Sequence, residues 1–122
     1  MVRLLLLLIT LIAIPLTQAC ATDVTAREAR QLVAEGAWLL DVRTRAEFAE
    51  RHLPGSVNIP VEELKQRLGE LAPTDRPLVV YCHTGVRAGF ATSILRRAGY
   101  RHVHNLGTIG RWSHEPVTPT TF

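Results

Sequence analysis

The segment Cys82–Arg87 (CHTGVR) places a thiol, a glycine and a guanidinium close together in the chain. It follows the continuous apolar run Leu78–Tyr81 and precedes a stretch with helical periodicity. A loop between a buried strand and a helix N-terminus presents backbone N–H groups and the positive end of the helix dipole, which favour a bound anion and a thiolate. Arg87 adds a permanent positive charge. The segment therefore predicts a nucleophilic thiolate at Cys82 that meets an anionic substrate.

Strand and helix patterns alternate on either side of this segment. The strands are expected at Trp38–Val42, Ser56–Ile59, Leu78–Cys82 and Val103–Leu106. Because the strand runs are nearly continuous in apolar residues, we expect an α/β fold with a roughly five-stranded, mostly parallel sheet and helices on both faces. In such sheets the ligand site lies beyond the carboxyl ends of the strands, which is where Cys82 stands.

Capping patterns mark the expected helices. Thr25 and Thr44 are each followed three residues later by a glutamate, which is capping-box spacing. A third helix is expected after Pro60, with its end at Gly69. A fourth should follow the Cys82 loop, with an apolar stripe formed by Val86, Phe90, Ile94 and Leu95.

The first 21 residues resemble a secretory leader. One cation, Arg3, precedes an apolar run from Leu4 to Ile14, and small residues flank Cys20. The run is too short for a membrane span, so we expect a signal peptide over residues 1–21, a mature domain over 22–122 and a periplasmic location. Lipid anchoring through Cys20 is the alternative. Either way Cys82 is the only thiol of the mature domain, which excludes a disulfide within it.

Charge and composition exclude other classes of partner. The 122 residues carry a net charge of +3, and the cations are scattered along the chain. This distribution gives no basis for nucleic-acid binding. His102 and His104 share a face of their expected strand, but no third ligand is near in sequence, so no metal is expected. A small domain with a site built from a loop can act as a monomer, which is the expected state.

Three segments resemble the signatures of rhodanese-like domains, and the likeness covers residues 24–112. The first two are Asp41–Phe48 (DVRTRAEF) and His52–Pro60 (HLPGSVNIP), and the third runs from Asn105 to Trp112. Together with the leader, they make the chain most similar to small exported single-domain rhodaneses of the phage-shock type. The resemblance implies a thiosulfate sulfurtransferase that needs no cofactor and works with a small-molecule sulfur donor and a thiophilic acceptor, cyanide or a thiol.

The resemblance also implies roles for individual residues. Cys82 would be the catalytic nucleophile and carry a persulfide between donor and acceptor. The substrate-binding loop would comprise His83, Thr84, Gly85, Val86 and Arg87. Arg87 either binds the donor's sulfonate through its planar fork, the preferred interpretation, or braces the loop. Asp41 and Arg43 would support the loops around the site, with substrate contact by Arg43 as the alternative.

The same loop is compatible with other functions. A persulfide carrier that serves a protein partner would use the same Cys82 chemistry. Related phosphatases and arsenate reductases have five residues between Cys and Arg, whereas this chain has four. The resemblance implies that the shorter loop suits a sulfur atom and is too tight for a tetrahedral oxyanion. A non-catalytic binding module with an inert, buried Cys82 is the remaining alternative.

Overall fold

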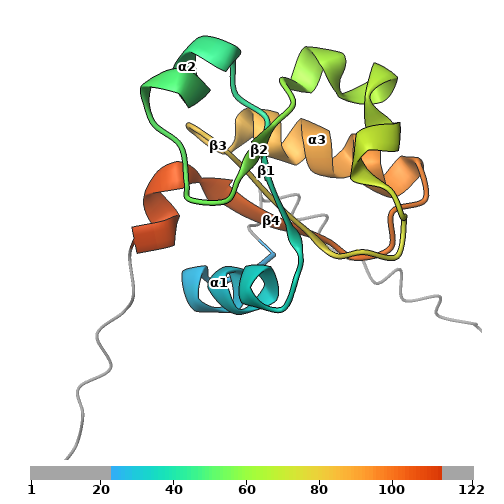
Figure 1. Cartoon of the computed structure of the whole chain (residues 1–122), viewed down its shortest axis with the longest axis horizontal. Coiled ribbons are helices and arrows are strands. Elements are labelled where there is room, and N and C mark those ends of the chain that lie inside the picture. The colour runs from blue at the N-terminus through green and yellow to red at the C-terminus, as the bar shows by residue number, and fades with distance from the viewer. Residues whose placement is uncertain (1–22, 114–122) are drawn as a thin grey trace, which may run out of the picture.

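Four parallel strands form the sheet of the computed structural model, which describes residues 23–113 (Figure 1). They are β1 (Trp38–Asp41), β2 (Val57–Asn58), β3 (Leu78–Cys82) and β4 (Val103–Thr108). Their order is β2-β1-β3-β4, so β3 lies at the centre, and all five of its residues are buried. The α/β class is confirmed, and of the roughly five strands expected, the described part of the chain forms these four.

Helices cover both faces of the sheet. On one side lie α3 (Val86–Arg97) and the two 3-10 helices η1 (Val61–Gln66) and η2 (Leu68–Leu71). On the other side lie α1 (Ala26–Ala34) and the 3-10 helix η3 (Ile109–Ser113). Figure 1 shows α1 and α3 on opposite sides of the strands. The short helix α2 (Arg45–Glu50) follows β1 at the carboxyl end of the sheet.

Both predicted capping boxes are present. The Thr25 hydroxyl accepts a hydrogen bond from the Glu28 N–H, and the Glu28 carboxylate accepts one from the Thr25 N–H. Thr44 and Glu47 make the same reciprocal pair at the start of α2. These local bonds satisfy backbone donors that have no partner inside the helix, so they fix where α1 and α2 begin.

Two sequence expectations on the α3 side of the sheet are wrong. The segment after Pro60 forms η1 and η2 in place of one α-helix, and Gly69 lies inside η2 rather than at a helix end. Its start carries no side-chain cap, and 3-10 geometry is common in such short pieces. In α3, Val86 and Phe90 are 57% and 64% exposed, because the helix turns this part of its stripe towards solvent.

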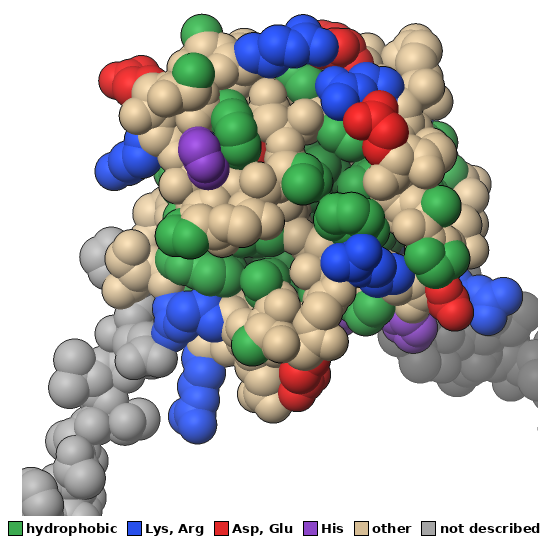
Figure 2. All heavy atoms as spheres, viewed as in Figure 1, with side chains coloured by type: hydrophobic (Ala, Val, Ile, Leu, Met, Phe, Trp, Pro, Cys, Tyr) green, Lys and Arg blue, Asp and Glu red, His purple; other side chains and the backbone are tan. Residues whose placement is uncertain are grey.

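Hydrophobic side chains of β1, β2, η1 and η2 also reach the surface. Trp38, Val57, Val61 and Leu68 are partly buried against the main core cluster. Figure 2 shows hydrophobic side chains gathered across the middle of the viewed face, with charged side chains around them. These four side chains are only partly exposed, whereas the exposed large hydrophobic side chains of the described residues are Val86 and Phe90.

The outer edge of β4 is bonded to residues outside the sheet. The Asp23 N–H donates to the Asn105 carbonyl at 2.8 Å, and the Asp23 carboxylate accepts from the Asn105 N–H at 3.2 Å. Arg96 of α3 donates to the Val103 carbonyl at 2.9 Å and also pairs with Asp23. Asp23 and Arg96 thus hold the start of the described chain against β4.

The predicted leader, with Cys20, lies outside the described residues. Between residues 23 and 113, no helix is both long and apolar enough to cross a membrane.

Candidate active site around Cys82

Cys82 is the last residue of β3 and is fully buried. It belongs to the core cluster on the α3 side of the sheet, which also contains Ala88 and Leu95. Its Sγ accepts a hydrogen bond from the Gly85 backbone N–H at 2.9 Å. The loop therefore turns back on the sulfur and directs a backbone dipole at it, an arrangement that favours negative charge on Sγ.

Gly85 makes this turn because its backbone is left-handed, with φ of 98°. A side chain at this position would be strained, since residues with a Cβ rarely adopt that conformation. Gly85 is also the N-cap of α3, and no side chain caps that helix. The first N–H groups of α3 are thus left for an anion at the mouth of the loop.

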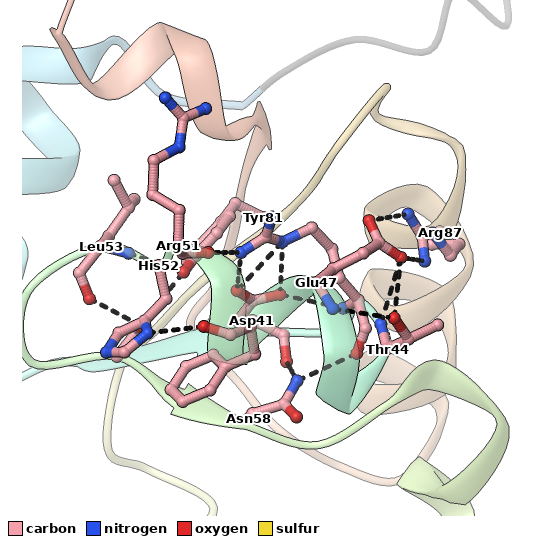
Figure 3. A network of polar contacts seen from close by, with 12 residues as sticks. Asp41, Thr44, Glu47, Arg51, His52, Leu53, Asn58, Tyr81 and Arg87 are labelled. Atoms are coloured by element: carbon pink, nitrogen blue, oxygen red, sulfur yellow. Dashed lines mark hydrogen bonds and ion pairs between the residues drawn. The ribbon is translucent and has the colours of Figure 1, made fainter.

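The remaining loop residues divide into exposed and anchored ones. His83, Thr84 and Val86 are exposed, and Arg87 is partly buried. Figure 3 shows Arg87 turned towards Glu47 of α2. Its Nη1 and Nη2 donate to the two Glu47 carboxylate oxygens at 2.7 and 3.0 Å. This ion pair is the contact that a bracing role of Arg87 requires, and donor binding by Arg87 stays a prediction.

This ion pair changes the titration of both partners. Hydrogen bonds from Arg87 lower the pKa of Glu47 to about 2, with further help from the Thr44 backbone and hydroxyl. The hydrogen bond to Glu47 raises the pKa of Arg87 above its ordinary value. Both groups are therefore charged throughout the neutral range.

Asp41 and Arg43 form a second, buried pair at the end of β1. Arg43 donates from Nε and Nη2 to the Asp41 carboxylate, with Nη2 2.6 Å from Oδ2, and both side chains are almost completely buried. The hydrogen bond to Asp41 raises the pKa of Arg43. Arg43 Nη2 also donates to the Arg51 carbonyl at 2.6 Å, which ties the end of α2 to β1 (Figure 3).

Neighbouring side chains complete this support. Asn58 Nδ2 donates to the carbonyls of Asp41 and Arg43 at 3.0 and 2.9 Å. The Tyr81 hydroxyl accepts from the Leu53 N–H at 3.1 Å and donates to Ser56 Oγ at 3.0 Å. Burial raises the pKa of Tyr81 to about 12. These bonds hold the segment after α2 against the strand that ends in Cys82.

A cavity of about 520 Å³ lies beside the loop. Its lining residues come from the loop and from the segment around α2: Arg43, Glu47, Glu50, Arg51 and His83. Of these, the sequence predicted Arg43 and His83 as site residues and Glu47 only as part of a capping box. The expected parallel topology could have indicated Glu47, Glu50 and Arg51 as well, because the segments that follow the adjacent parallel strands β1 and β3 must lie side by side.

The predicted site residues fall into two groups. The Gly85 N–H contacts the Cys82 sulfur directly, whereas Arg87 is paired with Glu47, and Asp41 and Arg43 are paired with each other. No cluster of three His, Cys, Asp or Glu side chains within residues 23–113 has metal-binding geometry. The arrangement can therefore support attack by a thiolate on an electrophilic atom, with charge stabilised by backbone N–H groups.

Comparison with protein families gives a match over most of the chain. The model of the rhodanese-like domain matches residues 25–115. Among solved structures, the human single-domain sulfurtransferase TSTD1 superposes with a TM-score of 0.66 at 36% identity, over 75% of this chain and 95% of that one.

Three curated relatives show how far the likeness extends. The thiosulfate sulfurtransferase PspE of Escherichia coli (strain K12) is 39% identical over 71 residues, which are 57% of this chain and 68% of that protein. The human thiosulfate:glutathione sulfurtransferase is 36% identical over 110 residues, 77% of this chain and 95% of that protein. The uncharacterized protein YqhL of Bacillus subtilis (strain 168) is 43% identical over 77 residues, and the chain spans only 60% of its length.

Proposed function

The chain belongs to the rhodanese family, and we propose that it is a thiosulfate sulfurtransferase in which Cys82 is the nucleophile. The observation that carries the proposal is the hydrogen bond from the Gly85 N–H to Cys82 Sγ, at the N-terminus of a helix that no side chain caps. Relatives named as thiosulfate sulfurtransferases support the same activity.

The first half-reaction forms a persulfide. The Cys82 thiolate attacks the outer sulfur of thiosulfate, the S–S bond of the donor breaks, and sulfite leaves with the electron pair of that bond. The terminal sulfur of the resulting Cys82 persulfide carries the negative charge. The loop N–H groups from His83 to Arg87 are the donors that would hold the donor anion and then this sulfur.

The second half-reaction passes the sulfur to an acceptor. Cyanide or a thiolate attacks the terminal sulfur, and the Cys82 thiolate is regenerated. The human relative's name indicates glutathione as that protein's acceptor, which makes a small thiol a reasonable acceptor class here. The reaction needs no resident cofactor or metal, since the nucleophile and its stabilising dipoles come from the chain itself.

A persulfide carrier for a protein partner is the second candidate. The exposed pair Val86 and Phe90 favours it, because both apolar side chains lie in the first turns of the helix that begins at the loop. Phosphatase or arsenate reductase activity is not supported, since Arg87 is occupied by Glu47 and the loop is short.

We also propose that residues 1–21 are a leader for export to the periplasm and that residues 22–122 form a monomeric domain. Cleavage before Cys20 would give the lipid-anchored form, and cleavage after Ala21 would give the free form. The mass of the protein purified from a producing cell decides between them, and size-exclusion chromatography reports the oligomeric state.

The direct test is intact-mass spectrometry of the purified protein before and after thiosulfate, with Cys82→Ser as the control. We expect a gain of one sulfur atom that cyanide removes and that the control does not show. A persulfide that cyanide removes only slowly would favour the carrier. The absence of an adduct, together with a Cys82 that alkylating reagents do not modify, would contradict both the sulfurtransferase and the persulfide carrier. The non-catalytic binding module would then be the remaining alternative.

A further inference from the structure

Arg51 has a fixed backbone and a free side chain at the edge of the site. Its N–H donates to the Glu47 carbonyl at 3.1 Å, and its carbonyl accepts from Arg43 at 2.6 Å. Its guanidinium makes no hydrogen bond or ion pair with any residue from 23 to 113. Figure 3 shows this side chain extending away from Asp41, with no dashed line to its guanidinium.

The other two arginines near the loop are already occupied. Arg43 is bound by Asp41 and Arg87 by Glu47, each through a fork of two N–H donors. In each case a carboxylate occupies one edge of the guanidinium and compensates its charge, which makes it a weaker site for an anionic substrate. Within the described part of the chain, Arg51 is thus the arginine of the cavity wall whose fork is open to a ligand.

The cavity beside the loop is large for an inorganic donor. Its volume of about 520 Å³ lies in the range of sites that enclose organic molecules. Arg51 also lines an adjoining cavity of about 140 Å³, between the end of α2 and η3. Glu50 lines the larger cavity as well and makes no ion pair with a described residue, so a purely anionic ligand meets repulsion there.

We propose that Arg51 binds the carboxylate of the thiol that accepts sulfur from Cys82. This inference rests on the proposed function and names the acceptor class: a small organic thiol with a carboxylate, preferably one that also carries an ammonium group for Glu50. Arg51 is a binding residue that selects the acceptor, and the loop supplies the reacting sulfur. Charge-assisted hydrogen bonds of a guanidinium fork to a carboxylate give the selection its strength.

The reaction that Arg51 serves is balanced without a further reagent. The acceptor thiolate attacks the terminal sulfur of the Cys82 persulfide, and a new S–S bond forms on the acceptor. The bond between that sulfur and Sγ breaks, and its electron pair returns to Cys82 as the thiolate. His83, the exposed loop residue on the same cavity wall, marks the side from which the acceptor approaches.

The test compares two acceptors of similar size that both carry an ammonium group, cysteine with a carboxylate and cysteamine without one. The persulfide is first formed from thiosulfate, and the rate of its decay is then measured with each thiol. We expect Arg51→Gln to lower the ratio of the two rate constants about tenfold, the scale of one lost charge-assisted hydrogen bond. Arg51→Lys should restore part of the ratio, since it keeps the charge and loses the fork.

Arg97→Gln is the matched control, because Arg97 is an exposed arginine in the last turn of α3. It removes the same charge and should leave the ratio unchanged. An unchanged ratio in Arg51→Gln, with normal persulfide formation, overturns this inference alone. A lower rate of sulfite release from thiosulfate, with the ratio unchanged, assigns Arg51 to the donor and also overturns it. Failure of the unmodified protein to take up sulfur would instead overturn the proposed function.

Discussion

The Arg87 guanidinium and the Glu47 carboxylate face each other as two forks, with N–O distances of 2.7 and 3.0 Å. The pair joins the first turn of α3 to α2 through two residues that are 40 positions apart in the chain. The same Glu47 also closes the capping box of α2 through Thr44. One carboxylate therefore sets both the start of α2 and the position of the helix that follows Cys82.

Glu47→Gln should reduce stability at neutral pH but not at strongly acidic pH. Glutamine can keep the capping box, so the change removes mainly the charge that pairs with Arg87. We expect a loss of about 0.5–1 kcal/mol at pH 7, as for a partly exposed ion pair. Because folding lowers the pKa of Glu47 to about 2, the stability from this group is complete above its unfolded pKa and is lost as pH falls towards 2.

Urea unfolding of both proteins at a series of pH values from 7 to 2 measures this difference. The gap between them should close at the acid end of the series. Glu35→Gln, which changes the same charge on α1, serves as the control. A gap that stays constant down to pH 2 would contradict the proposed source of the stability.

Arg87→Gln and Glu47→Gln should lower kcat/KM for thiosulfate by similar factors, about threefold to tenfold, and the double variant should be no worse than either single one. The reason is that Arg87 acts on the loop through Glu47, so removing either partner removes the same coupling. Steady-state kinetics of the four proteins completes the cycle. A large rise in KM for Arg87→Gln alone would show instead that Arg87 binds the donor.

Gly85→Ala should impair both activity and stability, whereas Gly89→Ala should not. The left-handed φ of 98° at Gly85 is unfavourable for alanine by about 1–2 kcal/mol, and relaxing it moves the N–H away from Cys82 Sγ. Gly89 lies inside α3 with no atom within 4 Å of an added Cβ. Alanine there favours the helix by up to about 1 kcal/mol.

Thermal unfolding and the yield of persulfide from thiosulfate report the two effects separately. The Gly85 variant should lose most of its persulfide yield, and the Gly89 variant should keep it. Equal yields from the two variants would refute the role assigned to the Gly85 N–H.

Asp41→Asn should destabilise the fold by about 3 kcal/mol or more. Asp41 is fully buried and Arg43 nearly so, and removing one partner of a buried ion pair leaves the other charge uncompensated. Glu70→Gln, which breaks the exposed pair with Arg67, should cost far less, because solvent screens that pair. Equilibrium unfolding in urea compares the two, and a loss as small as that of Glu70→Gln would contradict a structural role for Asp41.

Local patterns predicted much of the fold. The apolar run that ends at Cys82 and the capping boxes at Thr25 and Thr44 depend on neighbours in the chain, so the sequence alone locates them. The 3-10 geometry of η1 and η2 was not predictable in this way, because apolar residues at i, i+3 and i+7 fit several helix types in so short a segment.

The site was predictable only where it is continuous in the chain. The loop from Cys82 to Arg87 is one segment, and its position at the end of a strand followed from the pattern. The partner of Arg87 is Glu47, and the backbone of Arg51 is held by Arg43, which are contacts between separate elements. Such contacts depend on how α2 packs at the end of the sheet, which no local pattern specifies.

The hydrogen bonds at the outer edge of β4 affect the tendency of the protein to aggregate at high concentration. An unpaired sheet edge is a template on which another chain can add a strand and begin to aggregate. Here the Asn105 N–H and carbonyl are taken by Asp23, and the Val103 carbonyl is taken by Arg96. At the opposite rim, β2 is only two residues long and offers little to pair with. Both rims of the sheet therefore resist edge-to-edge growth.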